Sequence, residues 1–259
     1  MRTPFLLAAA VALAASPAAA LDRFEIQVYG PDLNAPGELG AELHLNYAFR
    51  GEAAPAYPGE IPPDRSSHDT LEVAAGVTQW LELGAYLQTL SAPGYGLRYG
   101  GFKLRAKMVV PRRHTGDFFA GLNVEVGLVP VTVEQAAWAN ELRPILGWTN
   151  GVLLVDLNPI FGYALSGPDA FRVVLEPAAK VSVNTQLGFA LGVEWYGGLG
   201  FADALPPGRA QEHLLFAVFD LAAPKGGEEG WELDAGVGAG LTRATDRAWV
   251  AKAIVGHAF

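Results

Sequence analysis

From Leu39 to Phe259 the chain repeats one pattern, in which apolar and polar side chains alternate over about ten residues before a turn interrupts them. In the first stretch Leu43 and Leu45 share one parity, and Glu42 has the other. Successive side chains of a β-strand point to opposite faces, whereas a helix would scatter these residues around its axis. The pattern therefore predicts an all-β chain whose strands each have one apolar and one polar face.

About twelve such stretches follow one another, and roughly 9–11 residues are enough for a tilted strand to cross an outer membrane. Ten or fourteen strands also fit, because Phe24–Tyr29 resembles a further short strand and the stretch 211–221 is apolar on both faces. We place the longer connections, 51–69, 89–101 and 197–209, at the outer end. The turns near Gln79, Asn150 and Thr185 and the connections 110–117 and 222–230 then lie at the periplasmic end.

The first twenty residues resemble an export signal. Arg2 supplies a positive charge, residues 5–15 form a short apolar core, and Ala18–Ala20 offers a small-residue cleavage site. We expect cleavage after Ala20, with residues 21–38 as an N-terminal periplasmic segment and residues 39–259 as the barrel. A retained anchor helix is the alternative, which the short apolar core disfavours.

Composition narrows the class of protein. Hydrophobic residues make up 51% of the chain and charged residues 17%, which is apolar for a soluble domain. Beyond the leader no apolar run is long enough for a transmembrane helix, so a membrane would have to be crossed by strands. The net charge of −9 argues against nucleic acid as a partner, and the absence of cysteine excludes disulfides and thiol chemistry.

Two environments suit alternating strands. A soluble β-sandwich would bury the apolar faces and expose the polar faces to water. Here the polar faces combine glycine with Glu, Lys and Arg, unlike a solvated surface, and so many long strands would make an oversized sandwich core. In a transmembrane barrel, lipid covers the apolar faces, charged groups fill the lumen, and closure satisfies the backbone. We therefore predict an antiparallel transmembrane β-barrel of the outer-membrane type, surrounded by membrane lipid.

Aromatic residues and the C-terminus support a place in the outer membrane. The chain ends on Phe259, with apolar Val255 and Ala253 at alternate positions before it, and this strand resembles the segment that the outer-membrane barrel assembly machinery recognises. Such segments usually have an aromatic residue two positions before the end, and this chain has His257 there. Large aromatic residues recur near the predicted strand ends, as in interfacial girdles, at Tyr47, Phe49, Trp80, Trp138, Trp148, Trp195, Trp231 and Trp249.

Several segments are similar to those of a known family: 26–29, 36–38, 42–47, 101–107, 142–145, 176–180 and 252–256. Together they resemble the outer-membrane barrels grouped with the phenol meta-pathway family, which are described as transporters or have no assigned function. The resemblance implies a barrel that passes small hydrophobic or aromatic solutes. It implies no catalytic residue.

Inward positions of the predicted strands carry both signs of charge. Lys103 and Arg105 should pair with Glu82 and Glu125 on the two neighbouring strands. The lumen-lining residues that we expect are Glu42, His44, Glu72, Glu82, Lys103, Arg105, Lys107, Glu125, Glu141, Arg143, Asp156, Arg172, Glu176, Lys180, Glu194, Glu232, Asp234 and Lys252.

The charged lumen has two interpretations, since a barrel of this size lies between filled eight-stranded barrels and open sixteen-stranded porins. The charges either only fill and rigidify the interior, or they line a narrow water-filled pore and bias its selectivity. We predict a passive pore for small solutes. The alternative is a structural or surface-binding barrel without conductance, whose proline-rich loop 51–69 would be the binding element.

A lipid-modifying enzyme is a third hypothesis and the weakest. It would need a Ser–His–carboxylate set at the membrane rim, and His213 shows no recognisable spacing to Ser91, Ser166 or Ser182. The five histidines are scattered without metal-ligand spacing. We therefore expect no catalytic residue, no metal and no cofactor.

Overall fold

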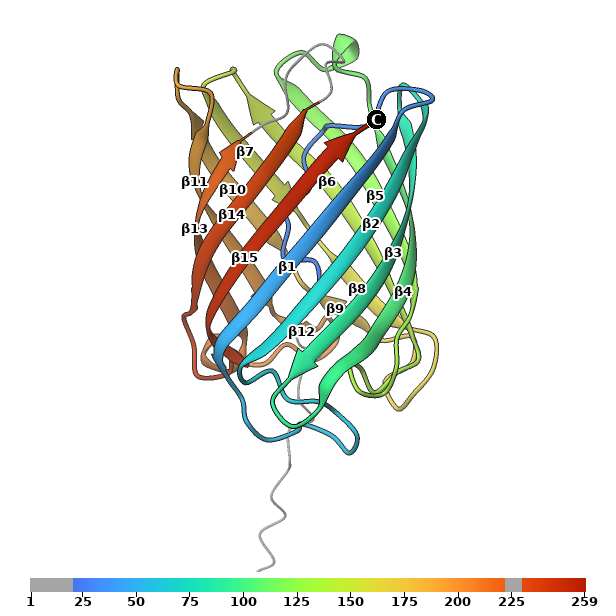
Figure 1. The fold of residues 1–259 in the computed structure, drawn as a ribbon, viewed down its shortest axis with the longest axis vertical. Helices are drawn as coiled ribbons and strands as arrows, with labels where there is room; N and C mark the ends of the chain where they lie inside the picture. The colour runs from blue at the N-terminus through green and yellow to red at the C-terminus, as the bar shows by residue number, and fades with distance from the viewer. Residues whose placement is uncertain (1–20, 222–229) are drawn as a thin grey trace, which may run out of the picture.

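Strands between Leu39 and Ala258 join into one antiparallel sheet that closes on itself (Figure 1). The structure is a computed structural model that describes residues 21–221 and 230–259. The predicted leader, including the cleavage site at Ala20, lies outside the described residues. Among the described residues, no helix is long and apolar enough to cross a membrane.

The predicted barrel of about twelve strands is confirmed. Three of the twelve are interrupted, so that fifteen segments appear in the sheet. In chain order they are β1 (Leu39–Gly51), β2 (Ser66–Thr78), β3 (Leu81–Ala92), β4 (Gly96–Val109), β5 (Phe118–Leu128), β6 (Trp138–Thr149), β7 (Leu153–Asn158) with β8 (Phe161–Ala164), β9 (Val173–Leu175) with β10 (Ala178–Asn184), β11 (Ala190–Gly198) with β12 (Gly200–Phe201), β13 (Glu212–Leu221), β14 (Trp231–Gly240) and β15 (Arg247–Ala258).

The first and last strands close the barrel. β1 pairs with β2 on one side and with β15 on the other, and Leu43 lies opposite Val255. Closure leaves no open edge, so that backbone donors and acceptors are satisfied within the wall, as a sheet in hydrocarbon requires.

Proline explains two of the interruptions. Pro159 separates β7 from β8, and Pro177 separates β9 from β10. Proline has no N–H to donate to the neighbouring strand, so the ladder breaks where it stands. These breaks lie on neighbouring strands of the wall, since β7 pairs with β10 and β8 pairs with β9.

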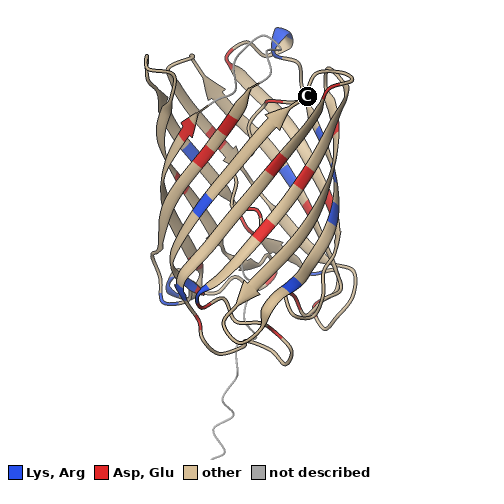
Figure 2. Cartoon of the chain, viewed as in Figure 1, with Lys and Arg blue, Asp and Glu red and all other residues tan. Residues whose placement is uncertain are grey.

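The two faces of the wall differ as the alternation predicts. On β3, Leu83 and Leu87 are exposed on the outside, whereas Glu82 and Tyr86 are buried inside. Acidic and basic positions are interspersed along the strands (Figure 2). Charged residues therefore occupy the interior of the barrel, and large apolar side chains cover its outside.

One predicted connection is wrong. We expected a long loop at 89–101, but only residues 93–95 separate β3 from β4. The alternation continues to Ala92, because Leu90 and Ala92 pack inward against Phe24. The connections 52–65, 129–137, 165–172, 202–211 and 241–246 lie with this hairpin at the end of the barrel opposite the C-terminus (Figure 1), which we call the loop end.

Candidate functional site

Residues 21–38, which we call the lumen segment, run through the inside of the barrel. We expected an N-terminal periplasmic segment here, and in the structure these residues lie inside the barrel wall. Phe24, Ile26 and Tyr29 are almost fully buried, with 2%, 3% and 4% of their surface exposed. The wall strands surround these apolar side chains, so the segment fills much of the lumen.

The lumen segment spans the barrel from one end to the other. At the loop end, Arg23 pairs with Glu60 of the β1–β2 connection at 2.8 Å and with Asp246 at 2.9 Å. At the opposite end, the backbone N–H and side-chain amide of Asn34 both donate to Glu82, at 2.7 and 2.8 Å. The chain then turns into β1.

Polar wall side chains bind backbone carbonyls of the lumen segment. Arg143 donates to the carbonyl of Gln27 at 3.1 Å, and Lys252 donates to that of Ile26 at 3.1 Å. Lys107 binds the carbonyl of Asp32 in the same way, at 2.8 Å. Buried carbonyls need such partners, so cations expected to line a pore instead hold the segment.

The ring of Tyr29 anchors the middle of the lumen segment. Its hydroxyl lies 2.8 Å from that of Tyr86 and donates to Glu125 at 3.3 Å. The guanidinium of Arg143 lies 4.3 Å from the ring centroid, within range of a cation–π interaction.

Several groups of ion pairs cross the interior, and the ion pairs of Lys103 and Arg105, which we call the first network, include those expected from the sequence. Lys103 lies 3.4 Å from Glu125, and Arg105 lies 2.7 Å from Glu82. Arg105 also pairs with Glu72. Asp22 of the lumen segment adds a contact with Lys103 at 2.7 Å, so the network joins wall and segment.

The second network joins β10, β11, β13, β14 and β15. Lys180 contacts Glu194 at 3.1 Å, Asp220 at 2.6 Å and Asp234 at 3.1 Å. Lys252 contacts Glu194 and also Asp234, the latter at 2.9 Å. Buried charges are costly unless paired, and here two cations serve three carboxylates.

The barrel brings together most of the residues that we expected in the lumen. Glu42, Glu141, Glu176, Glu232 and Asp234 are half-buried there. The fully buried ones are His44, Glu72, Glu82, Lys103, Arg105, Lys107, Glu125, Arg143, Asp156, Lys180, Glu194 and Lys252.

Arg172 differs from this set. It precedes β9 instead of lying within a strand, and it is half-exposed at the rim of the loop end. Phe171 beside it has a φ of 64°, which turns the chain out of the extended conformation. Arg172 pairs with Asp169 at 2.6 Å and with Asp203 at 2.9 Å, so it links two connections.

The fold also assembles a group with metal-ligand chemistry that sequence spacing did not indicate. One ligand atom from each of Glu42, His44 and Glu72 lies within 4.8 Å of the others. The register explains this, since Glu42 on β1 is directly opposite Glu72 on β2. Arg105 already pairs with Glu72, so the group forms part of the first network.

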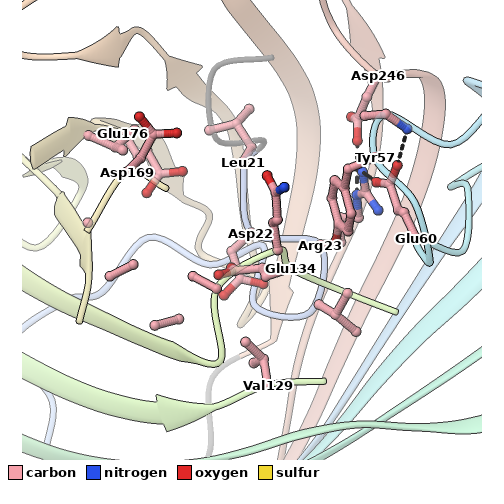
Figure 3. Close-up of a pocket in the computed structure, with 18 of the residues that line it drawn as sticks. Leu21, Asp22, Arg23, Tyr57, Glu60, Val129, Glu134, Asp169, Glu176 and Asp246 are labelled. Carbon is pink, nitrogen blue, oxygen red and sulfur yellow. Dashed lines mark hydrogen bonds and ion pairs between the residues drawn. The ribbon is translucent and has the colours of Figure 1, made fainter. Parts of the chain in front are cut away.

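A cavity of about 530 Å³ opens inside the barrel at the loop end, between the start of the lumen segment and the connections (Figure 3). We call it the vestibule. Its lining includes Asp22, Tyr57, Glu134 and Glu176. A second cavity, beside Glu42 and Glu232, has a volume of about 30 Å³.

Sequence reasoning missed the residues of the lumen segment and the polar neutral residues that hold it. Alternation does place the latter on the inward face, because their parity is that of the inward charges, but it gave no reason to single them out. The residues concerned are Asp22, Arg23, Glu25 and Tyr29 of the segment and Asn46, Tyr86, Gln88 and Asn158 of the wall.

The closed antiparallel wall, its apolar outside and its charged inside define a β-barrel of the outer-membrane type. Searches against family models and against curated proteins find no match. Among solved structures, the chain is similar to the COG4313 outer membrane channel from Pseudomonas putida F1, with a TM-score of 0.62, 12% identity, and coverage of 88% of this chain and 97% of that one. It is also similar to the KdgM porin, with a TM-score of 0.54, 11% identity, and coverage of 85% and 99%. At these identities the likeness establishes the fold.

Proposed function

We propose that this chain is an outer-membrane pore for small solutes, and that the lumen segment narrows its passage. The observation that carries the proposal is the vestibule, a solute-sized cavity that opens into a charged interior at the loop end. The solved barrels similar to this chain include one named a channel and one named a porin, which is in line with the proposal.

We further propose solutes with hydrophobic or aromatic parts, as the family resemblance implies. Apolar side chains in the vestibule support this, among them Phe24, Val129 and Val133. Export through a cleaved leader and insertion by the barrel assembly machinery belong to the same proposal.

Planar bilayers and liposome swelling test this function. We expect single-channel currents from the purified chain and uptake of small neutral and aromatic solutes. A correctly folded barrel that gave no current and no swelling would support the alternative, a structural or surface-binding barrel. A lipid-modifying enzyme gains no support from His213, whose ring stacks on Trp195 at a centroid distance of 5.7 Å.

A further inference from the structure

Carboxylates dominate the vestibule. Among the described residues that line it, three carry a positive side chain: Arg23, Lys103 and Arg172. Ten carry a carboxylate: Asp22, Glu52, Glu60, Glu125, Glu134, Glu141, Asp169, Glu176, Glu212 and Asp246.

The three cations are already engaged. Arg23 pairs with Glu60 and Asp246, Lys103 with Asp22 and Glu125, and Arg172 with Asp169. Within the described part of the chain, four lining carboxylates have no ion pair within 4.0 Å: Glu52, Glu134, Glu176 and Glu212. The vestibule therefore holds more carboxylates than its own cations can pair with.

Glu212 is an independent observation that points to a ligand. Only 7% of this residue is exposed, and it lines the vestibule. The N–H of Leu21 approaches one side of its carboxylate, but Oε2 has no hydrogen-bond partner in the described structure. The hydroxyl of Tyr57, which also lines the cavity, has none either. Buried polar atoms of this kind are costly unless a partner completes them.

Apolar and aromatic surface lies beside these charges. Phe24, Val129 and Val133 line the vestibule, and so does Phe201, whose ring already carries the guanidinium of Arg172 at 3.7 Å. A volume of about 530 Å³ suits a small organic molecule. Charge and shape together favour a ligand with a cationic head and an apolar body.

We infer that the vestibule binds organic cations, such as ammonium compounds with an apolar or aromatic part, and thereby makes the proposed pore prefer cations over anions. The inference deepens the proposed function and rests on it for transport. Binding itself requires only the folded barrel.

Calorimetry on the detergent-solubilised mature chain tests binding directly, with benzylammonium chloride, benzyl alcohol and sodium benzoate as probes of nearly equal shape. We expect saturable binding of benzylammonium, weaker binding of the alcohol and none of benzoate. At pH 8 the double variant Glu134→Gln/Glu176→Gln should weaken benzylammonium binding by about tenfold, since two carboxylates that face the ligand are removed. Asp117→Asn, on an exposed turn at the opposite end, should leave binding unchanged.

Reversal potentials in a KCl gradient test whether the pore prefers cations during transport. The pore should favour K⁺ over Cl⁻, and the double variant should reduce this preference where Asp117→Asn does not. Equal binding of the three probes, or undiminished benzylammonium binding in the double variant, would overturn the inference. Binding as expected without any current would instead contradict the proposed pore and leave the cation site standing.

Discussion

Asn158 holds the backbone of Tyr29 with both ends of its side-chain amide. The N–H of Tyr29 donates to Oδ1 at 2.6 Å, and Nδ2 donates to the carbonyl of Tyr29 at 3.0 Å. The amide thus supplies the donor and the acceptor that a neighbouring strand would supply. Because Asn158 ends β7, this contact fixes the middle of the lumen segment to the wall.

Replacing this amide should loosen the lumen segment. Asn158→Ala leaves a buried N–H and carbonyl without partners, which should lower the free energy of unfolding by about 1–3 kcal/mol and raise the single-channel conductance. Asn184→Ala is the matched control, because Asn184 binds the carbonyl of Gly151 in an exposed turn. A destabilised Asn158→Ala barrel with unchanged conductance would show that the segment does not limit the current.

Lys252 should be essential for stability. Lys252→Met removes a buried cation from Glu194 and Asp234 and a donor from the carbonyl of Ile26. An uncompensated buried charge should cost about 3–5 kcal/mol, measured by urea unfolding in lipid vesicles. Adding Glu194→Gln should restore part of this loss. A double variant no more stable than Lys252→Met would contradict the assigned network.

Gly76 tests how closely the lumen segment approaches the wall. A Cβ at this position would overlap the carbonyl oxygens of Asn34 and Ala35. Gly76→Ala should therefore displace this end of the segment and raise the conductance. Gly208→Ala is the control, since a Cβ there would meet no atom within 4 Å. Equal conductance in the two variants would count against the close packing.

Cation preference should depend on pH. Glu134 lies in the connection between β5 and β6, where water in the vestibule still reaches it. The residues around Glu134 in the vestibule reduce the solvation of its carboxylate. This desolvation and the negative charge of Asp22 raise the pKa of Glu134 to about 7. Its carboxylate is charged above this pH and neutral below it, so the K⁺ over Cl⁻ preference should be larger at pH 8 than at pH 5.5. Glu134→Gln should reduce this dependence in the same reversal-potential measurement.

Leu45 tests contact between the outer face and lipid. It lies midway along β1, with 41% of its surface exposed on the outside. Leu45→Arg should destabilise the barrel, lowering its free energy of unfolding in vesicles by about 2–4 kcal/mol, the range for arginine at a bilayer midplane. Leu97→Arg, next to the β3–β4 turn, should cost much less. Equal losses would contradict a membrane around the middle of the barrel.

The alternation of apolar and polar residues was enough to predict the wall. Because side chains two residues apart in a strand point to the same face, the charged positions of each stretch could be assigned to the inside together. Residues such as Glu82 and Lys103 could therefore be placed without knowledge of the tertiary fold. Arg172 was placed wrongly by this reasoning. A positive φ at Phe171 turns the chain, so the strand begins only at Val173, and the alternation of residue types does not show such a turn.

The lumen segment could not be predicted from the same pattern. Phe24–Tyr29 alternates like a short strand, and an extended chain in the middle of a barrel has the same local sequence as one within its wall. Its partners, such as Asn158 for Tyr29 and Lys252 for Ile26, are 129 and 226 residues away. The vestibule was beyond reach for the same reason, since distant connections and the segment build it jointly.

The direction of the lumen segment constrains how this molecule is built. Its first residues meet Asp246 and the β1–β2 connection, while β1 starts at the far end. Residues 21–38 therefore cross the interior before the first wall strand begins. Because β15 pairs with β1, the closed wall encloses residues 21–38, and the finished barrel is threaded by its own N-terminal segment.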